Sequence, residues 1–110
     1  MSANLHETHA HLGKVVYHKY VEYVGDNAEN ESGKSDKFWE VCVFEGRHGR
    51  GVMVRRWGKF GTNGQTNEKS FPSSYRARSK ASDIYHQKRD KGYTKEVDII
   101  TRLGTLVGED

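Results

Sequence analysis

The chain has 110 residues, of which 34% are hydrophobic and 30% charged, and its mean hydropathy is −0.91. This length and polarity suit one modest domain with one core, and no apolar run approaches the length of a membrane span. A single cysteine excludes an intrachain disulfide, and no basic segment followed by an apolar one marks a signal peptide, so a cytoplasmic location is expected.

The net charge of +3 is unevenly distributed. Residues 37–95 carry fourteen lysines or arginines against five acids, a net +9, whereas residues 1–36 and 96–110 each carry a net −3. A basic body between acidic ends predicts a polyanionic partner and leaves DNA, RNA and an acidic protein surface open.

The N-terminal third is predicted to hold a tail, a strand and a loop. Residues 1–13 read as a flexible polar tail. Its three histidines lack the spacing of a zinc protease and no acid or cysteine completes a metal site, so no metal or cofactor is expected. Residues 14–24 are rich in β-branched and aromatic types, which predicts a strand, and residues 25–36 form a long polar loop.

The second strand is predicted at residues 38–44. Its alternation places Trp39, Val41 and Val43 on one apolar face directed at the core. Cys42 lies in the same apolar run and reads as a small buried residue rather than a nucleophile.

A glycine-rich basic turn at residues 46–51 leads into a third strand at residues 52–60, and Asn63-Gly64 predicts a type I′ hairpin turn into a fourth strand at about residues 65–71. Residues 74–91 then predict one amphipathic helix, with Ser73 as its N-cap and Gly92 in the left-handed position after its end.

Residues 97–107 hold enough apolar side chains for a short helix or a last strand. The chain is therefore predicted to be an α+β protein, in which a twisted antiparallel sheet of four or more strands packs on one main α-helix. The domain spans residues 14–95, between the tail and a C-terminal extension at residues 96–110.

Residues 55–65, with the sequence RRWGKFGTNGQ, carry the strongest functional signal. Alternation puts Arg55, Trp57 and Lys59 on one strand face, and Gly58 would let a ligand backbone approach closely. A tryptophan on a strand is usually part of the core, and flanking charges are usually solvated. The alternative is an indole that stacks on a base or sugar while the cations bind phosphate.

The wider sequence favours the binding alternative. Trp57 is expected to be partly exposed, because its two cationic neighbours are costly to bury unpaired. Trp39, Val52 and Val54 would supply the opposite, core face. A single positive patch is expected to unite the following residues: Arg55, Lys59, Lys69, Arg47 and Arg50.

Several of these segments, in this order, resemble the WGR domain: residues 37–41 (KFWEV), 55–61 (RRWGKFG), Gly64-Gln65, Phe71, Ala77 and residues 91–93 (KGY). The resemblance covers roughly residues 14–95 and implies a small antiparallel sheet with one helix on one face. In eukaryotic poly(ADP-ribose) polymerases, a domain with this motif binds DNA at a break and relays that binding to a catalytic domain. Bacterial and phage relatives also occur, alone or fused.

The resemblance implies roles for individual residues. Trp57 matches the tryptophan that stacks near the terminal nucleotide of a break, and Gly58 matches the motif glycine. Lys59 replaces the motif arginine, so the charge is kept and the planar fork is lost. Gln65 matches a family glutamine that closes the hairpin or contacts the ligand.

The sequence thus predicts a stand-alone, non-enzymatic nucleic-acid-binding module of bacterial or phage type, with DNA as the expected partner and RNA left open. The rival hypothesis is a protein-interaction adaptor that docks on an acidic host protein. No membrane association is expected. An enzyme finds little support, because His18, His48 and His86 lie on separate elements and no nucleophile, P-loop or metal quartet is suitably spaced.

Overall fold

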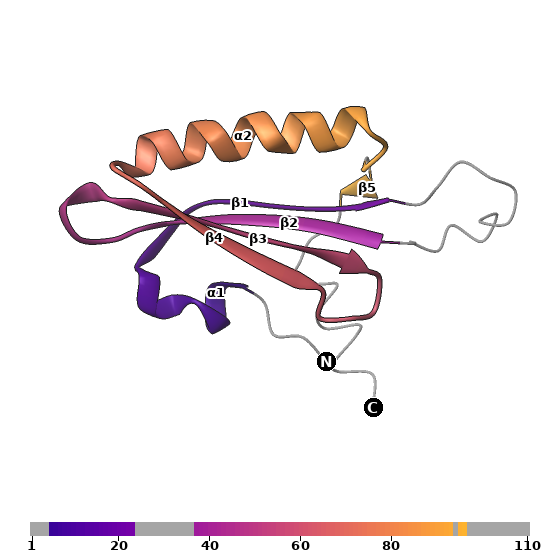
Figure 1. Cartoon of the computed structure of the whole chain (residues 1–110), viewed down its shortest axis with the longest axis horizontal. Helices are drawn as coiled ribbons and strands as arrows, with labels where there is room; N and C mark the ends of the chain where they lie inside the picture. Colours follow the sequence, from indigo (N-terminus) through magenta and orange to yellow (C-terminus); the bar gives the residue numbers. More distant parts are fainter. Residues whose placement is uncertain (1–4, 24–36, 94, 97–110) are drawn as a thin grey trace, which may run out of the picture.

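The computed structural model describes residues 5–23, 37–93 and 95–96, and its centre is an antiparallel sheet (Figure 1). Five strands form this sheet in the order β4-β3-β2-β1-β5. Their bounds are Lys14–Tyr23 for β1, Lys37–Glu45 for β2, Gly51–Lys59 for β3, Gln65–Phe71 for β4 and Lys95–Glu96 for β5. The predicted α+β class and the four main strands are confirmed.

The main helix, α2 (Ser74–Asp90), lies across one face of the sheet (Figure 1). Ser73 caps it as predicted, since its hydroxyl accepts a hydrogen bond of 3.2 Å from the backbone N–H of Arg76. Alanines at positions 77 and 81 are fully buried, and Gly51 lets the first turn approach β3 so closely that a Cβ there would lie 2.8 Å from the Cβ of Ala77. The core between α2 and the sheet contains the following buried residues: Val21, Trp39, Val41, Val43, Met53, Ala77, Ala81, Ile84 and Tyr85.

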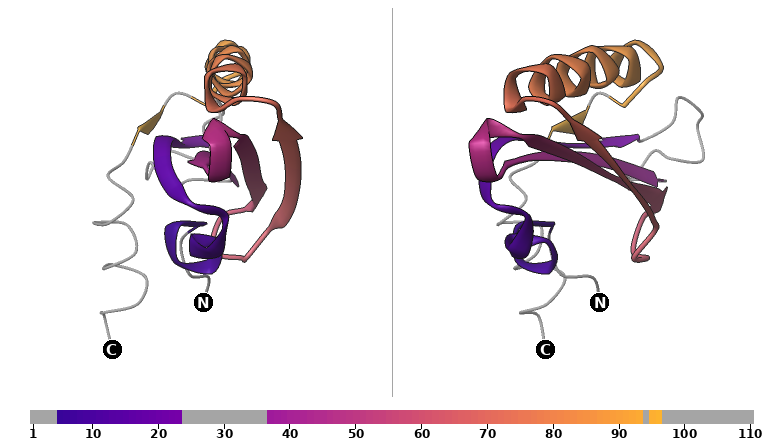
Figure 2. Two further views of the ribbon diagram at one scale, coloured as in Figure 1. Left: turned by 90° about the vertical axis from the view of Figure 1, so that its left-hand side faces the viewer. Right: turned by 60° about the vertical axis from the view of Figure 1, so that its left-hand side comes forward.

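The opposite face of the sheet is also covered at one end, by the N-terminal segment (Figure 2). Helix α1 (Leu5–Thr8) and the short 3-10 helix η1 (Ala10–Leu12) pack there, and Leu5 is only 1% exposed. Leu5 joins a second cluster with Cys42, Phe44 and Val54. The expectation of a flexible tail is therefore wrong for residues 5–13, because the apolar side chain of Leu5, in an otherwise polar segment, is buried in this second cluster.

The hairpin between β3 and β4 differs from the predicted type I′ turn. That turn needs a positive φ at Asn63, but the glycines at 61 and 64 are the loop residues with positive φ. A five-residue loop results, in which the N–H and hydroxyl of Thr62 both donate to the carbonyl of Lys59, at 3.1 and 2.7 Å. The loop still joins the two strands in the expected antiparallel register.

The predicted polar loop at residues 25–36 and the predicted C-terminal element at residues 97–107 lie outside the described residues. No helix in the described ranges has the length and apolar content needed to cross a bilayer.

Candidate functional site

Trp57 lies on the helix-covered face of the sheet, directly opposite Trp39 on the neighbouring strand. It is half-buried, as predicted, and packs against the edge of the core. The expectation that Trp39 serves the opposite face is wrong, because paired residues of antiparallel strands point to the same side. Val52 and Val54 do occupy the opposite face, where they meet the second apolar cluster.

Gly58 makes room for the hairpin loop on the side to which a Cβ would point, while its backbone borders a pocket beside Trp57. A Cβ at this position would lie 2.7 Å from the Cα of Gly64, so the loop folds back onto the glycine itself. Gly64 in turn fits against the carbonyl oxygen of Trp57, which a Cβ would approach to 2.3 Å. The two glycines therefore hold the loop tightly against Trp57 and fix the edge of the site.

A pocket of about 370 Å³ opens beside the indole. It is lined by Lys37, Trp57, Gly58, Lys59 and Tyr93, and we call it the Trp57 pocket. Lys37 and Lys59 are paired in the register of β2 and β3, and both are exposed. The pocket's described lining combines two ammonium groups with two aromatic rings and includes no acid.

Tyr93 reaches the pocket because of how α2 ends. The N–H of Tyr93 donates to the carbonyl of Lys88 at 3.0 Å, and the N–H of Gly92 donates to that of Arg89 at 3.1 Å, which is a Schellman motif. Gly92 takes the predicted left-handed role with φ of 110°. A Cβ on Gly92 would lie 2.6 Å from the ring of Tyr23, so the glycine also lets the chain pass close to that ring.

Lysine ammonium groups lie over the tyrosine rings beside the pocket. The rings of Tyr23 and Tyr93 are 5.4 Å apart, and the Nζ atom of Lys37 lies 4.7 Å and 5.6 Å from their centroids. The Nζ atom of Lys88 lies 5.5 Å from the ring of Tyr93. Each contact is within the range of a cation–π interaction.

Within the ranges that the structure describes, no acid forms an ion pair with the cations of this region. Burial lowers the pKa of Lys88, and the charges of Lys91, Arg55 and Lys37 lower it further. Within the described residues, none of these cations, nor Lys59, makes an ion pair. A bound anion would relieve this repulsion.

Two other residues that were predicted to bind nucleic acid lie next to the pocket. Gln65 pairs with Trp57 across the β3–β4 ladder and is exposed. Arg55 donates from Nη2 to Oδ1 of Asn67 at 2.9 Å, and its buried Nε has no hydrogen-bond acceptor in the described part of the chain.

The expected single positive patch is wrong, because the fold separates its members. Arg47 and Arg50 belong to the basic turn between β2 and β3, whereas Lys59 ends β3. The nine residues of β3 separate the two ends by roughly 26 Å at ~3.3 Å per residue. Lys69 lies between them, opposite Met53 on the edge strand β4.

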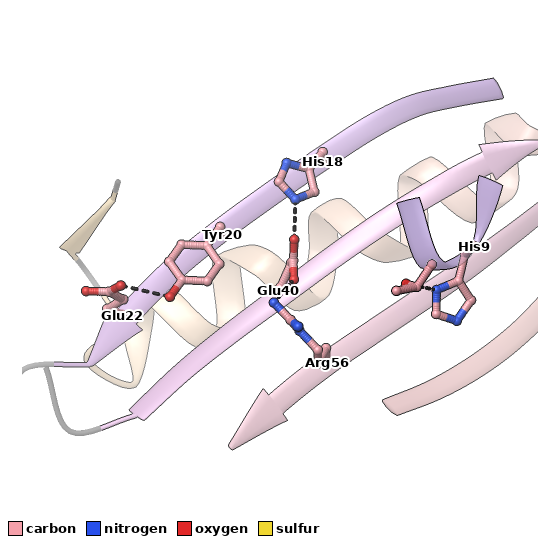
Figure 3. Close-up of polar contacts among 7 residues, drawn as sticks. His9, His18, Tyr20, Glu22, Glu40 and Arg56 are labelled. Atoms are coloured by element: carbon pink, nitrogen blue, oxygen red, sulfur yellow. Dashed lines mark hydrogen bonds and ion pairs between the residues drawn. The ribbon is translucent and has the colours of Figure 1, made fainter. Parts of the chain in front are cut away.

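A buried ionic cluster on the other face was not anticipated (Figure 3). Glu40 is fully buried, and its two oxygens lie 2.6 Å from Nε2 of His18 and 2.8 Å from Nη2 of Arg56. The Arg56 contact is an ion pair without hydrogen-bond geometry. The sequence did carry one signal for this cluster. Glu40 is a charged residue within an apolar run, and strand alternation puts it on the same face as Cys42 and Phe44.

Burial and the charge of Glu40 raise the pKa of the Cys42 thiol to about 12, which keeps it unreactive.

The described residues contain no cluster of three or more side chains of the metal-binding types. What the Trp57 pocket offers is cations around aromatic faces, which is chemistry for an anionic ligand that also presents a flat ring. The fold and the pocket together define a small α+β module with a cationic, aromatic-lined surface pocket.

The model of the WGR domain family matches residues 26–99. The chain belongs to the WGR domain family, which is a family of nucleic-acid-binding modules. Comparison with curated proteins and with solved structures gives no significant match.

Proposed function

We propose that this chain is a non-enzymatic DNA-binding module that recognises ends or breaks through the Trp57 pocket. The observation that carries the proposal is the group of three lysines, at positions 37, 59 and 88, around the rings of Trp57 and Tyr93 with no described acid among them. Lysines bind phosphates as point charges and do not distinguish one sequence from another.

The shape of the pocket favours an end over the interior of a duplex. Bases within a duplex are stacked on their neighbours, and their faces are not free to meet an indole. A terminal or unpaired nucleotide presents a base or sugar face that fits between aromatic rings, while its phosphates meet the lysines. A pocket of about 370 Å³ at the end of the sheet suits one such nucleotide.

A titration against several forms of DNA tests this function. Labelled blunt, nicked and single-stranded oligonucleotides are bound in a salt series, with closed-circular DNA as an unlabelled competitor. We expect tighter binding to the forms with ends or breaks. On oligonucleotides of about 5 base pairs, which reach only the Trp57 pocket, the logarithm of the affinity should fall with the logarithm of salt concentration with a slope of roughly −3, which corresponds to about three neutralised phosphates.

A pair of charge-matched variants locates the site. Lys37→Gln combined with Lys59→Gln should flatten the salt slope by about 2. Lys14→Gln combined with Arg78→Gln removes the same charge elsewhere and should leave the slope close to the wild-type value. Equal effects of both pairs, or preference for closed-circular DNA, would contradict the proposal.

The rival function as a protein adaptor has one specific observation behind it. Tyr75 is 77% exposed beside a pocket of about 340 Å³ that it lines with Tyr17, Arg78 and Asp83. Tyrosine and arginine are both enriched at protein-binding surfaces. Affinity for DNA that does not change with salt would favour this rival.

A further inference from the structure

The basic turn at residues 46–51 forms a second cationic pocket, at the opposite end of β3 from Trp57. This pocket has a volume of about 440 Å³, and Arg47, Arg50, Phe71 and Pro72 are among its lining residues. Both arginines are exposed, and neither makes an ion pair with an acid of the described ranges. The Nζ atom of Lys69 lies 5.6 Å from the ring of Phe71, which adds a third cation at the same end.

The edge strand β4 connects the two pockets. Its residues on the helix side, paired with Trp57, Arg55, Met53 and Gly51 of β3, are Gln65, Asn67, Lys69 and Phe71. We call this row the β4 track. Strand alternation directs the one acid of β4, Glu68, to the other face, where it lies 3.4 Å from the Nε2 atom of His9. The track is therefore polar and cationic, without a carboxylate.

The length of the track matches a short stretch of duplex. The two ends of β3 are roughly 26 Å apart. Successive phosphates of one strand of B-DNA advance 3.4 Å along the helix axis, so this separation corresponds to about 8 base pairs. A duplex whose terminal nucleotide occupies the Trp57 pocket would bring later phosphates to Arg47 and Arg50 if its axis follows the track.

We propose that the basic turn is a second phosphodiester-binding site, and that a DNA duplex held by its end in the Trp57 pocket runs along the β4 track to Arg47 and Arg50. This inference rests on the proposed function. It adds a footprint of about 8 base pairs, a direction for the duplex and a separate site for its phosphates.

Binding to two lengths of duplex tests the inference. The probes are blunt hairpins of about 5 and about 14 base pairs, closed by an uncharged polyethylene glycol linker so that the loop adds no phosphate. Arg47→Gln combined with Arg50→Gln should weaken binding to the long probe about tenfold, since each exposed arginine–phosphate contact contributes a modest amount. The same variant should bind the short probe like the wild type.

Two further variants complete the design. Lys69→Gln, on the track beside the basic turn, should weaken binding to the long probe by a smaller factor. Lys80→Gln combined with Arg78→Gln, both at exposed positions of α2, is the charge-matched control and should affect the two probes equally. All of these substituted side chains are exposed, and thermal unfolding checks that each variant is folded.

The outcomes separate the two proposals. Loss on the long probe alone supports the second site. Equal loss on both probes, or no loss on either, overturns it. If Trp57→Ala weakens binding to both probes while the basic-turn variant changes neither, the proposed function stands and the second site falls. If Trp57→Ala leaves both unchanged, the proposed function itself falls.

Discussion

Arg55 and Arg56 are neighbours in the chain, yet they belong to two regions with opposite electrostatic character. Arg56 is 5% exposed and lies 2.8 Å from the buried carboxylate of Glu40. Arg55 lies on the other face of the sheet, where it contributes to the repulsion that lowers the pKa of Lys88. One region has its charges paired inside the protein, whereas the other gathers like charges at the surface.

The difference separates stability from binding. A buried ion pair must be kept intact, because removing one partner leaves an uncompensated charge in a medium of low polarity. Crowded surface cations instead destabilise the folded protein slightly and favour any anion that joins them. The Trp57 pocket therefore carries a charge arrangement that folding does not need.

The largest predicted effect is the contrast between the two arginines. Arg56→Gln leaves Glu40 with His18 alone and should lower the free energy of unfolding by about 3–5 kcal/mol. Arg55→Gln should change it by less than about 1 kcal/mol, since its partner Asn67 is exposed. Urea denaturation measures both values. Equal losses would remove the distinction between the two regions.

A smaller effect is expected in the hairpin that borders the pocket. Gly58→Ala places a Cβ 2.7 Å from the Cα of Gly64, so the loop must shift. We expect a loss of about 1–3 kcal/mol in the free energy of unfolding, as for other overpacked sites. Gly49→Ala is a suitable control for space, because nothing lies within 4 Å of its Cβ, although its φ of 75° adds strain. Unchanged stability of Gly58→Ala would mean that the space beside this glycine is free for a ligand.

The secondary structure was largely predictable because its signals are local. The strand patterns, the Ser73 cap and the glycine after α2 each depend on a few adjacent residues, and the structure confirms them. The half-buried position of Trp57 was also predicted, although the reason given was partly wrong. It is half-buried as expected, but it shares its face with Trp39 and the core.

The parts that were missed depend on contacts between distant segments. The Trp57 pocket needs Lys37 from β2 and Tyr93 from the turn after α2, and Lys88 of α2 lies over the ring of Tyr93. Only the sheet register and the Schellman motif bring these residues together. The same register places Arg47 and Lys59 at opposite ends of β3, whereas the charge of the sequence had suggested that they share one positive patch. The site of Leu5 carries no periodic signal at all.

A third prediction is that one substitution, at Lys88, changes protein stability and DNA binding in opposite directions. Because the pKa of Lys88 is lowered in the folded protein, its charge disfavours folding at neutral pH, and this penalty is relieved as the pH rises through the folded pKa towards the ordinary value for lysine. Lys88→Gln should therefore raise stability at neutral pH and weaken DNA binding. Compared with the variant, the wild type should gain stability between neutral and alkaline pH.

Denaturation at a series of pH values measures this difference, and subtracting the variant from the wild type cancels the opposite contribution of the Cys42 thiol. Lys80→Gln, on an exposed part of the same helix, is the control for the loss of one lysine from α2. Loss of stability in Lys88→Gln at neutral pH would show that the lysine stem stabilises the fold more than its charge opposes it.

The most direct test of the central claim is the affinity of Trp57→Ala for a short blunt DNA duplex, measured beside its stability. The account predicts that binding weakens about tenfold or more, because loss of one stacking ring is worth roughly 1–3 kcal/mol. The half-buried indole should contribute less to stability than Trp39, whose loss to Ala should lower it by about 3–5 kcal/mol. A folded Trp57→Ala protein that binds the duplex as tightly as the wild type would contradict the account.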